Sequence, residues 1–518
     1  MEKSKLVKLI ISAVLFLIVW LLPTTAFGVE GLTVVEQRII AIFVLAAVMW
    51  ILEPIPIWGT SVVVMVLMLL STSDSMFSFF KDNLSVNEIA NLLGITANSD
   101  AELTSAVEKA MKGHIIYNGA KLPILSAKSI MAAFADPTVM LFMGGFVLAI
   151  AATKYKFDAT LARTILKPFG TKPKFVMLGF LAVTALLSMF MSNTATAAMM
   201  VAILTPVLAH MDESDNKGRV GLALSIPVAA NIGGIGSPIG TPPNVVAVGW
   251  LEKMGINISF GSWMLLMVPV AALILFCAWI FLNKVFPCKQ EKIEVKIDGE
   301  VDKSTKAWIV YITFAVTIFL WVFGKELFGI NANVVALIPF AVFCICGVFE
   351  KKDLAKIDWD VLWLVAGGFA LGVGLEGKIG PTVNGETLTM SKHIVGSIPF
   401  ETWPIMLLII GSGILCLVMS TFMSNSATAA LLIPIFVAIA KGMGDQLAPY
   451  GGGITLIVGL ALSASFAMSL PISTPPNAIA YSKGFIKQKE MVLVGIFVGA
   501  ISLVIGYVAL FTFGSILN

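Results

Sequence analysis

Met-Ser-Asn-Thr-Ala-Thr-Ala-Ala, residues 191–198, returns almost unchanged as Met-Ser-Asn-Ser-Ala-Thr-Ala-Ala at residues 423–430. Each copy places three hydrogen-bonding side chains at a break in membrane-grade sequence; around the first copy the apolar runs are Val176–Met191 and Ala195–Leu208. Two apolar helices that meet at a short polar break predict a helical hairpin with a polar tip. The duplication indicates that the chain consists of two homologous halves.

Two more motif pairs support the duplication. Gly-Thr-Pro-Pro-Asn at residues 240–244 recurs as Ser-Thr-Pro-Pro-Asn at residues 473–477, and Gly-Gly-Phe at residues 144–146 recurs at residues 367–369. The copies follow one another in the same order and at nearly the same spacing. They therefore predict two repeats of one plan along the chain.

The boundary between the repeats is expected at the polar linker Pro287–Lys306. The first repeat would occupy residues 1–300 and carry a polar insertion at 71–129, and the second would occupy residues 301–518. An odd number of spans in each repeat would give the two repeats opposite orientations in the membrane.

The composition predicts an integral membrane protein. Hydrophobic residues make up 58% of the chain and charged residues 13%, about half of the roughly 25% charge that is usual in soluble domains. The long apolar runs fit helices, which need about 20 residues to cross the bilayer, and not the strands of a barrel. We expect an all-α polytopic protein with about eleven transmembrane helices and two re-entrant hairpins.

The charged residues and cysteines indicate topology and not a partner. The net charge of +3 is small and forms no nucleic-acid patch. Lys3, Lys5 and Lys8 precede the first apolar run, which we interpret as a retained span and not as a cleaved signal peptide, so the N-terminus is expected in the cytoplasm. The C-terminus is expected on the exterior. The five cysteines show no CxxC pairing and are interpreted as inert small hydrophobes.

Each half also contains a span that cannot remain helical throughout. Residues 233–240 are rich in glycine, and Pro471–Asn477 holds three prolines. Thr241 is an N-cap candidate for the helix that restarts after the first break. Interrupted helices at corresponding places of two repeats are the best sequence indication of a transporter's midplane binding site.

The chemistry available at these breaks favours a small anion. Exposed amides at helix N-termini carry partial positive charge, and Ser, Thr and Asn add donors that hold a carboxylate without a buried Arg or Lys. Carbonyl and side-chain oxygens at the same tips can coordinate sodium. Ser188 and Ser420 lie one helical turn before the tips and could add hydroxyls. A single Ser-Asn-Thr is more often a contact between helices than a site; the duplication favours a site.

Other candidates have plainer explanations. His114, His210 and His393 form no paired spacing and are expected in loops or interfaces. The Gly-Gly pairs are expected to be packing surfaces. Lys378 and Lys483 are expected to extend to an interface, or else one of them supplies fixed positive charge near the site.

With these motifs in hand, the chain resembles the divalent anion/sodium symporter family, the dicarboxylate and citrate carriers that include the INDY proteins. The resemblance covers nearly the whole chain. It implies a homodimer with a scaffold domain at the dimer interface and a transport domain that moves as an elevator, the two domains being interleaved across both halves. It also implies substrates such as succinate, malate, fumarate, 2-oxoglutarate or citrate.

The resemblance also assigns residues to roles. The residues that would bind the substrate carboxylates are Ser192, Asn193, Thr194, Thr241, Ser424, Asn425, Ser426 and Thr474. In sodium-coupled members, the first cation site would match Ser188, Ser192, Asn193 and Gly240. The second would match Ser420, Ser424, Asn425 and Ser473. No catalytic residue is expected, and no cofactor, with Na+ taking part only if the protein is a symporter.

Several positions depart from the family pattern and bear on coupling. Ser426 replaces Thr, Ser473 stands where sodium-coupled relatives carry a small apolar residue, Lys483 replaces a small uncharged one, and Thr153-Lys154 replaces Glu-Arg. These changes would weaken the second sodium site. We therefore favour a sodium-independent dicarboxylate exchanger of a bacterial-type plasma membrane, with a sodium-coupled dicarboxylate or citrate symporter as the alternative.

Other classes receive less support. An intramembrane enzyme would need an HExxH motif or paired aspartates, and the sequence has neither arrangement. A channel would differ from a carrier in showing neither saturation nor counterflow. An inorganic-anion carrier or a sodium/proton carrier on the same fold is the main alternative within transport.

Overall fold

The computed structural model describes residues 3–77, 80, 99, 102, 105, 116–117, 120–121, 124–212, 214–295, 301–380, 382–383, 386–397 and 404–517. The chain forms two compact units, which we describe separately. Unit 1 comprises Met1–Asp136, Trp359–Pro404 and Ala430–Ala448; unit 2 comprises Pro137–Asp358, Ile405–Ala429 and Pro449–Asn518. Both units draw on both predicted repeats. Most of the predicted insertion at 71–129 lies outside the described residues.

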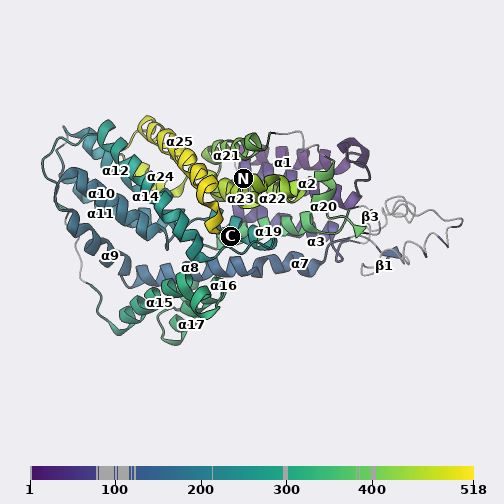
Figure 1. Ribbon diagram of the computed structural model, residues 1–518, viewed down its shortest axis with the longest axis horizontal. Helices are drawn as coiled ribbons and strands as arrows, with labels where there is room; N and C mark the ends of the chain where they lie inside the picture. Colours follow the sequence, from purple (N-terminus) through teal and green to yellow (C-terminus); the bar gives the residue numbers. More distant parts are fainter. Residues whose placement is uncertain are drawn as a thin grey trace. The chain divides into compact units, whose positions relative to one another are not determined.

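The described residues are overwhelmingly helical (Figure 1). The helices of unit 1 are α1 (Lys3–Leu21), η1 (Thr24–Phe27), α2 (Val34–Leu52), α3 (Ile57–Thr72), α7 (Ala127–Ala132), η2 (Ala133–Ala135), α19 (Trp359–Glu376) and α20 (Met390–Gly396). Two antiparallel pairs of two-residue strands occur in the same unit: β1 (Ile116–Tyr117) with β2 (Ala120–Lys121), and β3 (Thr382–Val383) with β4 (Glu386–Thr387). The all-α prediction is confirmed.

Unit 2 contains most of the other helices among the described residues. In the first repeat they are α8 (Pro137–Lys154), α9 (Phe157–Leu166), η3 (Lys167–Phe169), α10 (Pro173–Ser188), α11 (Asn193–His210), α12 (Asn216–Gly234), α13 (Pro242–Lys253) and α14 (Phe260–Val285). In the second they are α15 (Thr305–Phe328), α16 (Ala332–Val335), α17 (Leu337–Ile345), α18 (Lys351–Leu354), α21 (Ile405–Phe422), α23 (Gly452–Ser465), α24 (Pro475–Ser482), α25 (Gln488–Phe513) and η6 (Gly514–Leu517). Two elements extend across the division between the units: α22 (Asn425–Met443) and η5 (Gly444–Tyr450).

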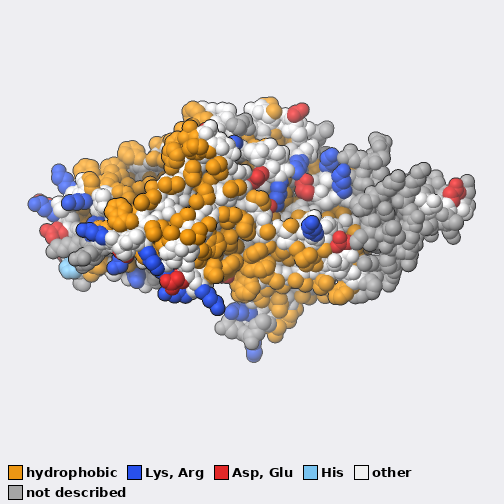
Figure 2. Space-filling model, turned by 90° about the horizontal axis from the view of Figure 1, so that it is seen from below, with side chains coloured by type: hydrophobic (Ala, Val, Ile, Leu, Met, Phe, Trp, Pro, Cys, Tyr) orange, Lys and Arg blue, Asp and Glu red, His pale blue; other side chains and the backbone are white. Residues whose placement is uncertain are grey.

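Ten helical segments among the described residues are long and apolar enough to cross a membrane, with mean hydropathies from 1.3 to 2.7. Four shorter apolar helices accompany them, including α10 and α23. Large hydrophobic side chains lie exposed on α14, α15 and α25, and Figure 2 shows hydrophobic side chains covering much of one face. A surface of this kind fits lipid and not water, so the prediction of a polytopic membrane protein is confirmed, with ten candidate spans against about eleven expected.

Small residues allow the helices of unit 2 to pack closely. α12 packs against α10, α11 and α24, while α23 packs against α13 and α21. A methyl group added at Gly233 of α12 would lie 2.5 Å from the backbone oxygen of Ala185, and one at Gly144 would lie 2.7 Å from the carbonyl carbon of Ala336. The predicted packing role of the first Gly-Gly pair therefore agrees with its contacts.

Both predicted interruptions are present. α12 ends at Gly234 and α13 begins at Pro242, while α23 ends at Ser465 and α24 begins at Pro475. Thr241 and Thr474 occupy the N-cap positions of the helices that restart, and proline follows each at the first helical position. Proline suits this position because its missing N–H would have no partner there.

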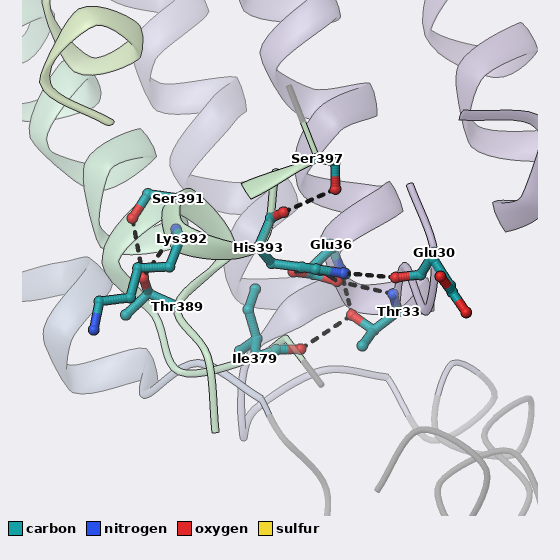
Figure 3. A network of polar contacts seen from close by, with 9 residues as sticks. All are labelled: Glu30, Thr33, Glu36, Ile379, Thr389, Ser391, Lys392, His393 and Ser397. Carbon is teal, nitrogen blue, oxygen red and sulfur yellow. Dashed lines mark hydrogen bonds and ion pairs between the residues drawn. The ribbon is translucent and has the colours of Figure 1, made fainter. Parts of the chain in front are cut away.

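In unit 1, a buried polar network joins the start of α2 to α20 (Figure 3). Thr33 and Glu36 form a capping box, in which Thr33 N donates to Glu36 Oε2 at 2.9 Å and Glu36 N donates to Thr33 Oγ1 at 3.1 Å. His393 Nδ1 lies 2.9 Å from Glu36 Oε1, and His393 Nε2 lies 2.8 Å from the backbone oxygen of Glu30. The backbone oxygen of Glu30 only accepts, so Nε2 donates to it, and Nδ1 forms an ion pair with Glu36 when the ring is protonated.

The environment of His393 differs from the expected loop or interface. Its side chain is 7% exposed and Glu36 is fully buried. Burial disfavours the charged ring, but the hydrogen bond and the charge of Glu36 outweigh it and raise the pKa of His393. The network therefore holds α20 against the N-terminus of α2.

Candidate functional site

The two Ser-Asn tips are helix N-termini. Ser192 caps α11, its Oγ accepting a hydrogen bond from Ala195 N at 3.2 Å, and Ser424 accepts from Ala427 N at the same distance. Asn193 and Asn425 are the first residues of the helices that follow. The serine caps satisfy one backbone amide at each tip. The other amides of the first turn and the positive end of the helix dipole are therefore left for a ligand.

A cluster of oxygens surrounds the end of the Asn193 side chain. Ser188 Oγ donates to the backbone oxygen of Ala230 at 2.7 Å and lies 2.6 Å from the Asn193 amide. The same amide lies 3.0 Å from the backbone oxygen of Gly240 and 3.3 Å from that of Ala230. We call Ser188, Asn193, Ala230 and Gly240 the first cradle.

The Asn193 amide has two ways to satisfy the first cradle. With its nitrogen inward it donates to these oxygens. With its oxygen inward, Asn193 Oδ1 can accept from the Ser188 hydroxyl, while the backbone oxygens of Gly240 and Ala230 also face it, and a cation between these oxygens would remove the remaining repulsion. Neutral oxygens of this kind are the ligands that hard cations prefer.

Glycines make room for the first cradle. A methyl group at Gly234 would lie 2.8 Å from Asn193 Oδ1, 3.0 Å from its Nδ2 and 3.1 Å from the backbone oxygen of Gly240. Asn244 holds the loop between α12 and α13, because its Nδ2 donates to the backbone oxygens of Gly234 at 3.2 Å and Ser237 at 2.9 Å. The glycine-rich sequence after α12 thus lets the backbone approach Asn193.

The second half repeats this arrangement. Ser420 Oγ lies 2.8 Å from Asn425 Oδ1 and 2.9 Å from the backbone oxygen of Ala464. Asn477 Nδ2 donates to the backbone oxygens of Met468 at 2.7 Å and Leu470 at 2.9 Å, as Asn244 does in the first half. We call Ser420, Asn425 and Ala464 the second cradle.

The Ser473 side chain forms two hydrogen bonds. Its hydroxyl donates to the backbone oxygen of Thr421 at 2.7 Å and accepts from Leu470 N at 3.1 Å. The first contact ties the loop before α24 to the end of α21, and the second lies within that loop. The Ser473 hydroxyl therefore stabilises the loop and does not join Asn425 in the second cradle.

The remaining sequence-predicted residues divide into two groups. Thr241 and Thr474 are buried at the starts of α13 and α24. Thr194 is exposed and Ser426 is half-buried, each one residue beyond the tip asparagine. Among the described residues, no hydrogen bond joins the tripeptide that begins at Ser192 to the one that begins at Ser424. None of the predicted site residues is ionisable, and the described residues contain no cluster of three His, Cys, Asp or Glu suited to a metal.

The two lysines singled out from the sequence are both exposed. Lys378 is exposed in unit 1, just after α19. Lys483 is exposed and follows the last residue of α24. Eight helical residues separate it from Thr474, a rise of about 12 Å at 1.5 Å per residue. Lys483 therefore cannot hydrogen-bond a ligand held at the start of α24.

Asp215 fixes the base of the first broken helix. It caps α12 through Gly218 N at 3.2 Å and also accepts from Lys289 N at 2.8 Å and from Cys288 Sγ at 3.1 Å. Burial would raise the pKa of Asp215, but these donors outweigh it and lower the pKa. Burial and the neighbouring carboxylate raise the pKa of Cys288 to about 12. A raised pKa makes the reactive thiolate form scarce, and Cys288 is a hydrogen-bond donor and not simply a hydrophobe.

Sequence reasoning missed one buried polar residue at this site. Asn231 lies next to Ala230, is 2% exposed, and contacts Thr474 and Asn477 of the second half. The available signal was an asparagine within the apolar stretch 220–232, where a polar side chain requires a partner.

Two broken helices, two capped hairpin tips and two oxygen cradles in a polytopic helical protein define a membrane transporter of the repeat type. The chain matches the family described as "Sodium:sulfate symporter transmembrane region" over residues 3–518, and it belongs to that family.

Relatives with curated descriptions agree with this assignment. The chain is 32% identical to an "Uncharacterized transporter" of Haemophilus influenzae, over 74% of this chain and 82% of the relative. It is 31% identical to "Sodium-dependent high-affinity dicarboxylate transporter 3" of Caenorhabditis elegans, over 73% and 74%. It is 30% identical to "Sodium-dependent dicarboxylate transporter SdcS" of Staphylococcus saprophyticus, over 74% and 77%.

The fold is similar to that of a solved transporter structure, and at this low identity the similarity concerns the fold only. The YdaH transporter of Alcanivorax borkumensis superposes with a TM-score of 0.50 at 12% identity, covering 82% of this chain and 96% of that one.

Proposed function

We propose that this protein is a sodium-coupled symporter of C4 and C5 dicarboxylates such as succinate, malate, fumarate and 2-oxoglutarate. The sequence motifs favoured sodium-independent exchange, with sodium-coupled symport as the alternative. The names of the relatives support sodium-coupled symport, because two of these relatives are sodium-dependent dicarboxylate transporters. The observation in this molecule that carries the proposal is the first cradle around Asn193.

The first cradle suits sodium as a transported co-substrate. The hydroxyl of Ser188 and the backbone oxygen of Gly240 lie 2.6 Å and 3.0 Å from the inward-facing atom of the Asn193 amide. In our proposal, the Asn193 oxygen turns inward when sodium binds and its nitrogen turns inward when sodium leaves. The orientation of the Asn193 amide at the tip of α11 would thereby depend on whether sodium occupies the first cradle.

The anion would bind at the helix N-termini beside the cradles. Asn193 and Asn425 begin α11 and α22, and Thr241 and Thr474 cap α13 and α24. Amide N–H groups and neutral side-chain donors stabilise a carboxylate without the desolvation cost of a buried cation. The substrate ligands we propose are Ser192, Asn193, Thr194, Thr241, Ser424, Asn425, Ser426 and Thr474.

Two sequence features that favoured exchange, Ser473 and Lys483, give it less support once their positions in the structure are known. The Ser473 hydroxyl is engaged with Thr421 and Leu470, so its presence need not disturb a cation at the second cradle. Lys483 is about 12 Å along α24 from Thr474, too far to replace sodium at the start of that helix. The proposed second sodium ligands remain Ser420, Ser424, Asn425 and Ser473, with Ser473 offering its backbone oxygen as Gly240 does in the first cradle.

Alternating access would carry sodium and substrate together across the membrane. The elevator motion, the homodimer, the plasma-membrane location with a cytoplasmic N-terminus, and the two inverted repeats remain predictions. None of the proposed steps forms or breaks a covalent bond, so the proposed protein is a transporter and not an enzyme.

Substrate class can be tested in proteoliposomes that contain purified full-length protein. Labelled succinate uptake is measured under an inward sodium gradient, with unlabelled succinate, citrate or sulfate as competitor. We expect competition by succinate and none by sulfate. Inhibition by sulfate and not by succinate would contradict the proposal and identify an inorganic-anion carrier.

Asn193→Ala and Asn425→Ala test the site in the same assay. Both are expected to abolish uptake without unfolding the protein. Asn283→Ala is the matched control, because Asn283 of α14 bonds the backbone of its own helix at Trp279. Wild-type uptake by both tip variants would refute the assignment of these residues.

A further inference from the structure

Asn231 links the two halves of the candidate site. It follows Ala230, whose backbone oxygen belongs to the first cradle. Its Nδ2 lies 3.2 Å from Thr474 Oγ1 and 3.2 Å from Asn477 Oδ1. Both acceptors belong to the second half, so one buried amide joins the end of α12 to the start of α24.

The hydrogen-bond pattern fixes the orientation of this amide. Asn477 Nδ2 lies 2.7 Å from the backbone oxygen of Met468 and 2.9 Å from that of Leu470. Backbone oxygens only accept, so this atom of Asn477 is its nitrogen and its oxygen faces Asn231. The Asn231 atom that faces this oxygen must then be nitrogen. Its two N–H groups therefore donate to Asn477 and Thr474.

This orientation of Asn231 determines how the Thr474 hydroxyl can form hydrogen bonds. Its oxygen accepts from Asn231 Nδ2 at 3.2 Å and from Asn477 N at 3.3 Å. A hydroxyl has two acceptor positions and one hydrogen, so Thr474 can only donate further. Among the described residues, no acceptor takes this hydrogen. The Thr474 hydroxyl hydrogen is thus available to an acceptor from outside the protein, such as one oxygen of an anion.

Thr241, the equivalent of Thr474 in the first half, is not held by an asparagine in this way. Ser465 of the second half is the sequence equivalent of Asn231, because it follows Ala464 of the second cradle as Asn231 follows Ala230. The Ser465 hydroxyl donates to the backbone oxygen of Ala461 at 3.0 Å. Thr241 makes no side-chain bond at its cap position, and the buried Asn244 Oδ1 has no partner within the described residues. Thr241 and Thr474 are equivalent in sequence and different in chemistry.

We propose that Asn231 is a positioning residue for substrate recognition: by occupying the Thr474 hydroxyl oxygen, it fixes Thr474 as a hydrogen-bond donor to one substrate carboxylate. The Thr241 hydroxyl is not fixed in this way and can donate or accept. The site therefore has one end that takes only a hydrogen-bond acceptor, such as a carboxylate oxygen, and one end that takes either a donor or an acceptor. This inference rests on the proposed function, because it takes Thr474 as a substrate ligand.

The test uses purified full-length protein and ligand-induced thermal stabilisation. Succinate is titrated at saturating sodium, and sodium is titrated alone. Asn231→Ser installs the residue type of the second half. We expect its half-saturating succinate concentration to rise roughly tenfold to 100-fold, the range for a hydrogen bond to a charged group, and its response to sodium alone to stay unchanged. Ser465→Ala is the matched control and should behave as wild type in both titrations.

A double-variant cycle separates positioning from a general structural role. In the Thr474→Val background, Asn231→Ser should cause no further loss, because the hydroxyl through which it acts is gone. Equal losses in the succinate and sodium titrations, or an undiminished effect in the Thr474→Val background, would overturn the proposal.

Two further arms keep the outcomes distinct. If Asn231→Ser does not fold, Asn231→Asp keeps the shape and replaces the donor by an acceptor, so it should weaken succinate binding at least as much; wild-type affinity would overturn the inference. If wild type responds to sulfate and not to succinate, the proposed function fails. The same cycle run with sulfate then decides the inference separately, since sulfate also presents oxygen acceptors.

Discussion

Replacement of Gly234 by alanine tests whether the first cradle must approach Asn193 closely. The added methyl group would lie 2.8 Å from Asn193 Oδ1 and 3.0 Å from its Nδ2. Ordinary van der Waals contact begins near 3.4 Å, so the Asn193 amide must move by several tenths of an ångström. Since α12 ends at Gly234, its backbone cannot relax without also shifting the loop that leads to Gly240.

The magnitude follows from the cost of overpacking. Extra methyl groups in well-packed sites cost about 1–3 kcal/mol. If this cost falls on the sodium-bound arrangement, the half-saturating sodium concentration rises roughly fivefold to 150-fold. The assay is the sodium dependence of succinate uptake into proteoliposomes, combined with thermal unfolding of the purified protein.

Gly411→Ala is the control for Gly234→Ala. Gly411 lies within α21, and an added methyl group there meets nothing within 4 Å. It should leave sodium dependence unchanged and stabilise the helix by about 0.5–1 kcal/mol. A Gly234→Ala variant with wild-type sodium dependence would refute the reasoning, because it would show that Asn193 need not occupy the observed position.

Three further predictions concern the supporting structure. His393→Asn should remove a pH-dependent part of the stability: the raised pKa of His393 means that its ion pair with Glu36 stabilises fully below the ordinary pKa of about 6.5 and is lost as the pH rises through the raised value. Thermal unfolding measured from roughly pH 6 to pH 9 should therefore decline in wild type and stay flatter in the variant. Asp215→Asn should destabilise the fold by about 1–3 kcal/mol, since Asp215 accepts from Gly218, Lys289 and Cys288; an unchanged denaturation midpoint would contradict this. Ser473→Ala should lower thermal stability slightly, by about 1 kcal/mol, and leave sodium dependence intact; a large change in sodium dependence would mean that the hydroxyl contributes to the second cradle.

The sequence predicted the broken helices and the hairpin tips because they are duplicated locally. Ser192 and Ser424 precede apolar stretches, and the Thr-Pro-Pro-Asn motifs follow stretches that glycine or proline interrupts. Caps, breaks and periodicity depend on neighbouring residues, so short-range reasoning suffices for them.

The contacts between distant segments were not predictable in this way. Glu36 and His393 are 357 residues apart, and a lone histidine within a short polar stretch gives no indication of its partner. Asn231 and Thr474 are 243 residues apart, and the duplication concealed their contact because it indicates equivalence of the halves. The difference arises from one substitution within the repeats, Asn231 against Ser465, whose effect depends on what each side chain meets in three dimensions.

Coupling mode was the least predictable property. The serine at 473 and the lysine at 483 looked like changes to the second sodium site. Their effect depends on direction and distance: Ser473 bonds Thr421, and Lys483 lies beyond the far end of α24. Sequence position alone fixes neither.

The most direct test of sodium-coupled symport uses purified protein in liposomes that are either empty or preloaded with unlabelled succinate. Labelled succinate uptake is followed with sodium or potassium outside. We predict uptake into empty vesicles that requires the sodium gradient. Uptake that requires internal succinate and is the same with potassium would contradict the proposal and establish an exchanger.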